Sequence, residues 1–157
     1  MPNARTGHCQ CDAVRYCLTG EPLTLFACHC TDCQRQSSSA FGMALWVRKA
    51  DVEMLSGEMK EWVRELPSGR RMACRFCPDC GTRLFHQVLG QEEVMSIKPG
   101  TLEDTRGLQP VGHIWTSRRQ PWVQLDEGSL HYPGNPDNFE ALLGAWHAAS
   151  AAGADQP

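Results

Sequence analysis

The chain has 157 residues, of which 41% are hydrophobic, and a formal net charge of -3. This length suits one domain that buries about two-thirds of its unfolded surface. The slightly acidic balance gives no electrostatic case for binding nucleic acid or an anionic membrane. The first residues lack the positively charged segment followed by an apolar segment that is typical of a signal peptide. No apolar run approaches the ~20 residues that are needed to span a membrane. We therefore expect a cytoplasmic protein without nucleic-acid or membrane partners.

Most of the chain is predicted to form short strands joined by turns. Alternating apolar residues predict strands over 13–18 and 41–47. Two hairpins follow, with arms over 61–66 and 71–76, and then over 84–88 and 94–98. Residues 99–121 form the longest irregular stretch, which we expect to wrap the sheet or to border a site.

One helix is predicted, from Pro136 to about Ala148. Apolar side chains recur there at helical spacing, namely Phe139, Leu142, Leu143 and Trp146. Asn135 is placed to cap this helix, and Pro136 suits its first position. We expect residues 149–157 to be a flexible tail. Because no repeat or linker divides the chain, residues 1–148 are predicted to form a single domain.

Seven of the nine cysteines fall in three tight clusters, which are Cys9 and Cys11, then Cys28, Cys30 and Cys33, then Cys77 and Cys80. Thiolates two or three residues apart can share one metal ion, whereas this spacing is poor disulfide geometry. In a reducing compartment, clustered cysteines are metal ligands rather than bridges. Seven ligands are one fewer than two closed tetrahedral zinc sites require.

The last cluster is the most specific. Cys77-Pro78-Asp79-Cys80-Gly81 has the form of a zinc knuckle, in which Gly81 follows where a positive φ is often needed. Strand periodicity predicts that the sulfurs of Cys9 and Cys11 share one face and supply the other two ligands. Such a closed four-thiolate site is expected to be structural, with a binding energy of ~10 kcal/mol or more. The alternative is that these four are ordinary buried cysteines.

The middle cluster has three thiolates within six residues, from Cys28 to Cys33. Three protein ligands with a free fourth position are typical of catalytic zinc. Three alternatives remain: Cys74 or Cys17 completes a second structural site, Cys30-Thr31-Asp32-Cys33 is a redox pair, or all seven cysteines serve one site. We favour the open site because nothing close in sequence offers a fourth ligand.

Several segments together resemble a known family, namely Gly7-His8-Cys9-Gln10-Cys11, Cys28-His29-Cys30-Thr31-Asp32-Cys33, Arg75-Phe76-Cys77-Pro78-Asp79-Cys80-Gly81, His113-Ile114-Trp115 and Pro121-Trp122. The resemblance is to the glutathione-dependent formaldehyde-activating family, which includes centromere protein V, and it runs from about Gly7 to Trp122. It implies a mainly β fold of several small antiparallel sheets rolled around zinc, similar to Rab-accessory zinc proteins, and this chain would add one short C-terminal helix.

The same resemblance implies two zinc ions per chain. Structural zinc would be held by Cys9, Cys11, Cys77 and Cys80. A second zinc, associated in the family with glutathione and formaldehyde chemistry, would be held by Cys28, Cys30 and Cys33. The chain departs from the family at Asp12 and Ser38, where glycine is usual. The shape of the loops around the second metal therefore does not follow from the resemblance.

A zinc ion with three thiolate ligands is a weak Lewis acid and a good holder of a further thiolate. This chemistry suits the addition of glutathione to formaldehyde, or cleavage of the resulting carbon–sulfur adduct. The sequence therefore predicts a zinc-dependent carbon–sulfur lyase that acts on a small-molecule thiol adduct. Two alternatives are a non-catalytic two-zinc interaction module and a thiol redox or metal-handling protein.

Other side chains receive weaker predictions. His29 is either a donor behind the zinc ligands or exposed, and Asp32 is most simply a solvated turn residue. His113 is a candidate pocket wall or proton relay, against the alternative of a packed core histidine. Four arginines flank the knuckle, namely Arg70, Arg71, Arg75 and Arg83. We expect them to offset the negative charge of the thiolates, and the alternative is that some of them bind the carboxylates of a substrate.

Overall fold

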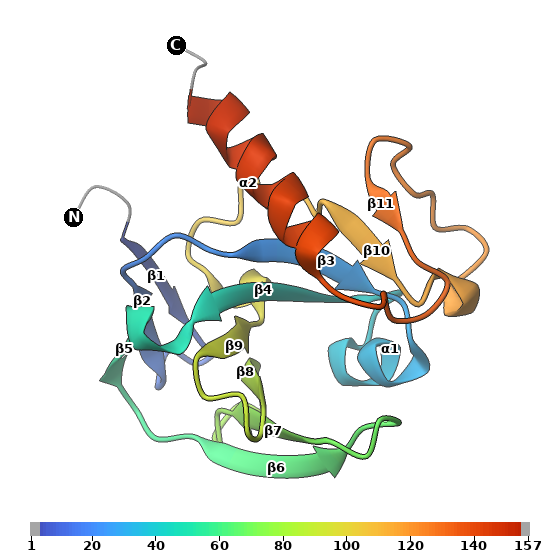
Figure 1. The fold of residues 1–157 in the computed structure, drawn as a ribbon. Helices are drawn as coiled ribbons and strands as arrows, with labels where there is room; N and C mark the ends of the chain where they lie inside the picture. Colours follow the sequence, from blue (N-terminus) through green and yellow to red (C-terminus); the bar gives the residue numbers. More distant parts are fainter. Residues whose placement is uncertain (1–3, 155–157) are drawn as a thin grey trace. The chain divides into compact units, whose positions relative to one another are not determined.

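The computed structural model describes residues 4–154, and the chain forms two compact units. Of the described residues, unit 1 comprises 4–22 and 46–107, and unit 2 comprises 23–45 and 108–154. Eleven strands and two α-helices in the described range make the fold mainly β, which confirms the predicted fold class (Figure 1). The prediction of one domain over 1–148 stays a prediction.

Among the described helices, none combines the length and the apolar character that crossing a membrane requires.

Unit 1 contains two groups of antiparallel strands. The first has the order β1–β2–β5, with β1 (Arg5–His8), β2 (Arg15–Leu18) and β5 (Val52–Ser56). The second has the order β6–β7–β8–β9, with β6 (Lys60–Glu65), β7 (Arg71–Phe76), β8 (Arg83–Val88) and β9 (Val94–Ile97). Short 3-10 helices at Lys49–Asp51 and Pro99–Thr101 precede β5 and follow β9. Both predicted hairpins are confirmed.

Tyr16 is central to the core of unit 1. Its ring is fully buried and meets Phe85 edge-on, with centroids 5.0 Å apart. Its hydroxyl lies 2.7 Å from Thr101 Oγ1, and burial raises the pKa of Tyr16 to about 12, so the group stays neutral. Gly7 is its cross-strand partner, and a Cβ at Gly7 would overlap the Tyr16 ring. A larger residue at this position would therefore have to displace the Tyr16 ring.

We expect Gly7→Ala to lower the free energy of unfolding by about 1–3 kcal/mol, because the added methyl group overpacks the Tyr16 site. Urea denaturation followed by circular dichroism measures this loss. Gly100→Ala is the matched control, since a Cβ there meets no atom within 4 Å. Equal midpoints for the two variants would contradict the packing argument.

Unit 2 is built on parallel strands, which differs from the antiparallel sheets that were predicted. The order is β11–β10–β3, with β3 (Thr24–Cys28), β10 (Gly112–Ile114) and β11 (Leu130–His131). Next to β3 comes β4 (Gly42–Arg48), whose first four residues belong to this unit. The helices are α1 (Thr31–Ser37), a 3-10 turn at Thr116–Arg118 and α2 (Glu140–Ala154).

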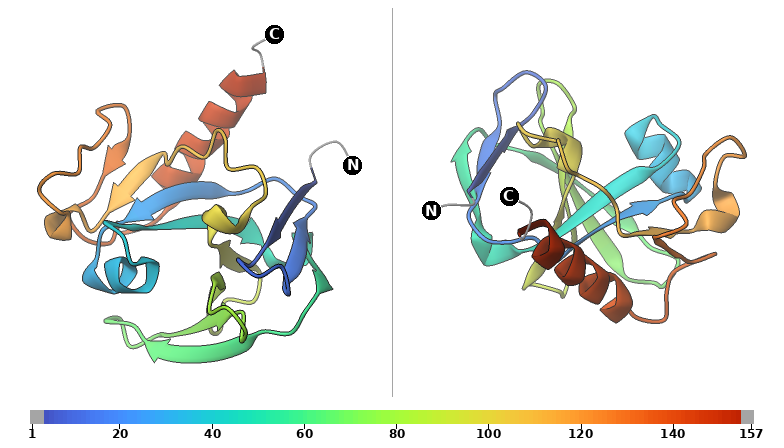
Figure 2. Two further views of the ribbon diagram at one scale, coloured as in Figure 1. Left: turned by 180° about the vertical axis from the view of Figure 1, so that it is seen from behind. Right: turned by 90° about the horizontal axis from the view of Figure 1, so that it is seen from above.

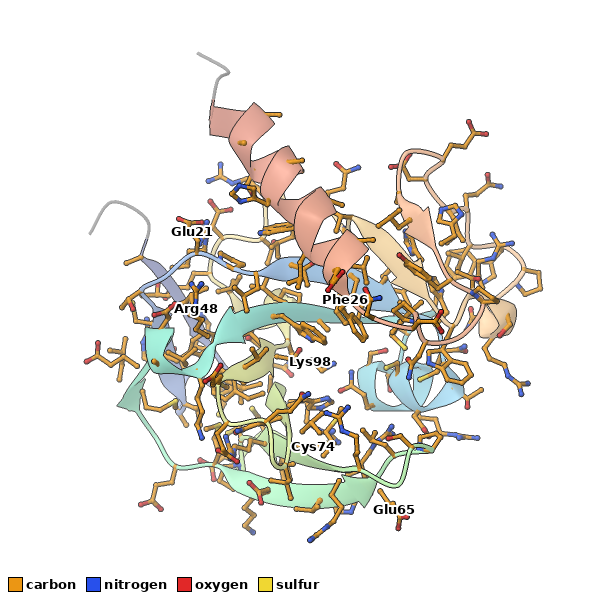
Figure 3. All side chains as sticks on the ribbon, in the orientation of Figure 1. Glu21, Phe26, Arg48, Glu65, Cys74 and Lys98 are labelled. Carbon is orange, nitrogen blue, oxygen red and sulfur yellow. The ribbon has the colours of Figure 1, made fainter. Side chains whose placement is uncertain are left out.

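Helix α2 packs against β3 (Figure 2). Phe26 of β3 lies 5.5 Å from Phe139, centroid to centroid, and is labelled in Figure 3. Leu142 is fully buried, and its carbonyl accepts a 2.9 Å hydrogen bond from the buried hydroxyl of Thr24. The hydrophobic core of unit 2 is thus closed by apolar packing of a helix on a strand.

The boundaries predicted for this helix are wrong at both ends. It begins at Glu140, where Asn138 Oδ1 accepts the Glu140 amide at 3.0 Å. Asn135, the predicted cap, instead accepts a hydrogen bond from Trp115 Nε1 at 2.9 Å. The helix continues to Ala154, through residues that were predicted to be a flexible tail, and residues 155–157 lie outside the described range.

Candidate metal sites

Two turns of unit 1 bring four cysteines together. Cys9 follows β1 and Cys11 lies in the turn that leads to β2, so the prediction that both stand on a strand is wrong. The turn is closed by the Asp12 amide, which donates to the Cys9 carbonyl at 3.0 Å. Asp12 adopts φ 68, a left-handed conformation that carries the chain back toward Val14.

The second turn is the predicted knuckle between β7 and β8. The Gly81 amide donates to the Cys77 carbonyl at 2.9 Å, and Gly81 has φ +75, which confirms the predicted positive φ. Thr82 joins the two turns, because its hydroxyl accepts the Gln10 amide at 3.0 Å and lies 3.1 Å from Cys80 Sγ. Sequence reasoning missed Thr82, whose only signal is its place directly after the knuckle.

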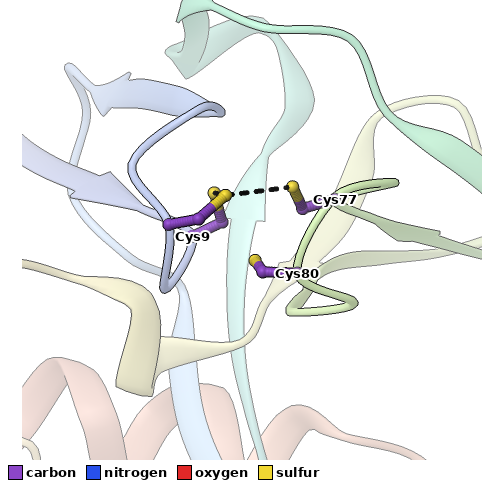
Figure 4. Close-up of side chains that lie close together, drawn as sticks. Cys9, Cys77 and Cys80 are labelled. Carbon is purple, nitrogen blue, oxygen red and sulfur yellow. Dashed lines mark hydrogen bonds between the residues drawn. The ribbon is translucent and has the colours of Figure 1, made fainter.

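The four sulfurs have the spacing of a zinc tetrahedron. Cys11 Sγ lies 3.6 Å from Cys9 Sγ and 3.7 Å from Cys77 Sγ, and the four sulfurs, with Cys80, lie within 4.8 Å of one another. Zinc–sulfur bonds of about 2.3 Å in a tetrahedron place sulfurs about 3.8 Å apart. Figure 4 shows Cys9, Cys77 and Cys80 turned toward a common centre. These four residues fit one zinc ion.

The acidity of these thiols shows how strongly the sulfurs influence one another. The hydroxyl and the amide of Thr82 lower the pKa of Cys80 to about 5. Burial opposes ionisation of Cys9, but the Val14 amide and neighbouring sulfurs outweigh it and lower the pKa. The pKa of Cys11 rises to about 12, because the sulfurs of Cys80 and Cys9 outweigh the favourable Ala13 amide. A divalent cation at the centre would relieve this mutual repulsion and let all four ionise.

The middle cluster lies where β3 ends and α1 begins, within unit 2. Cys28 is the last residue of β3, Cys30 is the N-cap of α1, and Cys33 lies in its first turn. Their sulfurs lie within 4.8 Å of one another. The Cys33 amide donates to Cys30 Sγ at 3.3 Å, which holds that sulfur at the helix start. Within residues 4–154, neither Cys17 nor Cys74 joins either group of candidate ligands.

The three sulfurs also share charge unequally. The neighbouring sulfurs of Cys28 and Cys33 lower the pKa of Cys30 to about 2. The sulfurs of Cys30 and Cys33, together with burial, raise the pKa of Cys28. The negative charge of the group therefore lies mainly on the Cys30 sulfur. Three closely spaced cysteine sulfurs are donors that zinc prefers.

His29 and His113 form a buried pair behind this cluster. His29 has no exposed surface, and its Nε2 lies 2.9 Å from His113 Nδ1. The main chain follows the same pairing, since the His29 amide donates to the Ile114 carbonyl at 3.0 Å. Burial lowers the pKa of His29 to about 4 and also lowers that of His113, so both rings are neutral. The structure thus brings His113 to the residue between Cys28 and Cys30.

A third histidine, which no sequence signal indicated, continues the row. His131 lies on β11 with its ring edge-on to His113, at 5.8 Å between centroids. Its Nε2 lies 2.9 Å from the Asp126 carbonyl oxygen. The row therefore runs from His29, directly after β3, to His113 on β10 and His131 on β11, and these three strands are adjacent and parallel.

The two positions where the sequence departs from its resembled family share one backbone feature. Asp12 has φ 68 and Ser38 has φ 50, both in the left-handed region that glycine adopts most readily. Ser38 ends α1, and its amide donates to the Arg35 carbonyl at 3.4 Å. Asp32, by contrast, is exposed and lies 3.8 Å from Arg35, as expected of a solvated residue.

A surface cavity of about 530 Å³ lies on the outer side of α1, lined by residues that include Gln34, Arg35, Ser38 and Trp122. Around a helix these α1 residues lie about 100–200° from Cys33, so the cavity and the Cys33 sulfur are on different faces of α1. A chain of side-chain hydrogen bonds still links the cavity to the backbone of the loop that carries the cysteines. Trp122 Nε1 donates to Gln120 Oε1 at 2.8 Å, and Gln120 Nε2 donates to Gln34 Oε1 at 3.2 Å.

Gln34 completes this chain, because its Nε2 donates to the His29 carbonyl at 2.8 Å and to the Arg118 carbonyl at 3.0 Å. We expect Gln34→Leu to lower the free energy of unfolding by about 1–3 kcal/mol, since a polar group near the cysteine loop loses its donor. Thermal unfolding measures the effect. Gln36→Leu is the control on the same helix, and an equal loss there would contradict this role for Gln34.

Comparison with known proteins adds three findings. The profile of a family described as glutathione-dependent formaldehyde-activating enzyme matches residues 4–118. A crystal structure of a Rhodobacter sphaeroides protein, a Northeast Structural Genomics target, is similar with a TM-score of 0.50 and 21% identity, over 81% of this chain and 98% of that chain. At that identity the likeness shows the fold alone. No curated protein matches the chain.

Proposed function

Because the chain belongs to the family of glutathione-dependent formaldehyde-activating enzymes, we propose that it is a zinc-dependent carbon–sulfur lyase. Its substrate would be a small thiol adduct, of which the adduct of glutathione and formaldehyde is the leading candidate. The observation that carries the proposal is that, among the described residues, Cys28, Cys30 and Cys33 form a group of three candidate ligands beside a separate group of four. Three protein ligands are the number that leaves a tetrahedral zinc one position for substrate.

The two groups would have different roles. Cys9, Cys11, Cys77 and Cys80 would hold a structural zinc that ties the turn after β1 to the knuckle. Cys28, Cys30 and Cys33 would hold a second zinc, whose positive charge would favour the thiolate form of a substrate thiol near neutral pH. The reaction itself forms one carbon–sulfur bond, and the thiol proton passes to the former carbonyl oxygen. Cleavage is the reverse of this addition.

His113 would act as a positioning residue for the second group. Its Nδ1 lies 2.9 Å from His29 Nε2, and His29 lies between two of the proposed ligands. Because both rings are buried, their hydrogen bond fixes the orientation of this loop without competition from water. The Cys33 amide fixes the Cys30 sulfur in the same way. The protein thus preorganises the three sulfurs before a metal or a substrate is bound.

One observation favours a second candidate function. Cys30 and Cys33 form a Cys-x-x-Cys pair at the start of a helix, which is the arrangement of many thiol redox proteins. A redox protein would lose two free thiols reversibly in mild oxidant and would turn over a disulfide substrate. The metal-holding function predicts instead that bound zinc protects these thiols from the oxidant.

The direct test follows the formation of the hydroxymethyl adduct by proton NMR, with glutathione and formaldehyde, at a measured zinc content of two per chain. We expect the zinc-loaded protein to raise the rate above that of buffer with free zinc. Cysteine and 2-mercaptoethanol as alternative thiols show which part of glutathione matters. An unchanged rate for every thiol, with both zinc ions present, would overturn the proposed function.

A further inference from the structure

One face of the strands β6–β9 carries polar side chains that the proposed reaction does not use. Directly paired residues of an antiparallel sheet point to the same face, and one such row is Trp62, Cys74, His86 and Ser96. The opposite face contains Phe85 and Ile97, which are buried in the core of unit 1. Cys74, which β7 contributes to this row, is buried and is labelled in Figure 3.

Arg83 reaches the same face through an irregularity in β8. The register between β7 and β8 shifts after Arg75, and the Arg83 guanidinium then lies over the Trp62 ring, 5.9 Å from its centroid. Arg83 Nη1 donates to His86 Nε2 at 3.0 Å. Within residues 4–154, Arg83 makes no ion pair. An arginine side chain has five N–H donors, so most of those on Arg83 remain available to a ligand.

The surroundings of Arg83 are positively charged. Burial lowers the pKa of His86 to about 2, and the charges of Lys98, Arg83 and Arg64 add to this effect. His86 is therefore neutral and can keep accepting the Arg83 hydrogen bond. The same three cations act on the thiol of Cys74.

The nearby carboxylate of Glu61 lies on the opposite face of these strands. Its charge raises the pKa of Cys74, but the carboxylate forms an ion pair with Arg75 at 3.1 Å. Glu61 and Arg75 are direct cross-strand partners in the alternate row, which points away from Trp62 and Cys74. This pair therefore does not occupy the Arg83 donors.

We propose that Arg83, supported by Trp62, His86, Arg64 and Lys98, forms a binding site for a small oxyanion, either a carboxylate or a phosphate group. The planar guanidinium offers the paired donors that such a group accepts, and Trp62 and His86 hold its plane in place. Arg64 and Lys98 add positive potential around the same point. The site lies within unit 1 and requires neither catalysis nor the second zinc.

The test titrates the zinc-loaded full chain with malonate, with phosphate, and with sodium chloride at equal ionic strength. NMR of the Trp62 indole N–H and the Arg83 Nε–H reports binding at the site. We expect saturable shifts with dissociation constants of about 10 mM or lower for at least one oxyanion, and no saturation with chloride. Malonate binding alone identifies a carboxylate ligand, phosphate binding alone identifies a phosphate ligand, and either supports the site.

Arg83→Gln is expected to weaken binding by about tenfold or more, because a charge-assisted bidentate contact is lost. Arg83→Lys, which keeps the charge but not the planar fork, should also weaken it, and this variant covers the case in which Arg83→Gln does not fold. Arg70→Gln removes the same charge from an exposed arginine and should leave the affinity unchanged within about twofold.

Two results would overturn the proposal, namely no saturable binding of either oxyanion, or equal weakening by Arg70→Gln and Arg83→Gln. Neither thiol nor formaldehyde is present in this titration. An inactive protein that binds an oxyanion therefore contradicts only the proposed function, and an active one that binds none contradicts only this site.

Discussion

Cys77→Ser is expected to release one zinc ion and to remove most of the stability of the fold. The Cys77 sulfur is fully buried and lies 3.7 Å from Cys11 Sγ, so it joins two turns that are far apart in sequence. Binding energies of ~10 kcal/mol for structural zinc are as large as the whole stability of a typical domain. Native mass spectrometry counts the metal, and thermal unfolding by circular dichroism measures the stability.

Cys17→Ser is the matched control for this result. Cys17 is a half-buried cysteine of β2 that belongs to neither group of candidate ligands. The same substitution there should leave two zinc ions bound and the unfolding midpoint nearly unchanged. Retention of two zinc ions by Cys77→Ser would contradict the assignment of the four-cysteine group.

Cys28→Ser is expected to separate activity from stability. It should release the other zinc ion and lower the rate of adduct formation by about 100-fold or more. The fold should survive, because the core of unit 2 is closed by Leu142 and Phe139 of the α2 region packing on β3 rather than by this cluster. The measurements are the NMR rate assay, metal counting and thermal unfolding on one preparation.

The comparison of Cys28→Ser with Cys77→Ser decides between two functions. If Cys28→Ser unfolds the protein as completely as Cys77→Ser, the second zinc is structural and the chain is a two-zinc interaction module. If Cys28→Ser stays folded with one zinc and full activity, the second group plays no part in the reaction. Only a folded and inactive variant agrees with the proposed enzyme.

The grouping of the cysteines could be predicted because it depends on local geometry. Two cysteines separated by one or two residues present their sulfurs to a shared point almost regardless of the surrounding fold. The positive φ of Gly81 follows from the same local turn, and the structure confirms it. Hairpin arms were also predictable, since β6 and β7 are joined by a short turn with proline and glycine.

Helix boundaries depended on contacts that the sequence pattern does not contain. Helix α1 carries no buried residue and has no apolar stripe, so periodicity could not indicate it. It is defined instead by Cys30 at its start and by the left-handed Ser38 at its end. Asn135 looked like a cap for α2, yet its side chain binds Trp115, which lies twenty positions earlier in the sequence.

The histidine row could not be predicted because it requires parallel pairing of distant strands. His29 and His113 are separated by 84 positions and meet only because β3 and β10 lie side by side. Strand β11 has two residues, too few for any periodicity to show, and it brings His131 to the row. Sequence reasoning could name His113 as a candidate but not the residue that it contacts.

X-ray absorption at the zinc edge, on protein with two zinc ions per chain, tests the central claim most directly. One ion with four sulfur ligands and one with three predict an average of between three and four sulfurs at about 2.3 Å, with a minor nitrogen or oxygen contribution. Adding glutathione should then raise the sulfur average toward four. An average of four before any thiol is added, or a shell dominated by nitrogen and oxygen, would contradict the account.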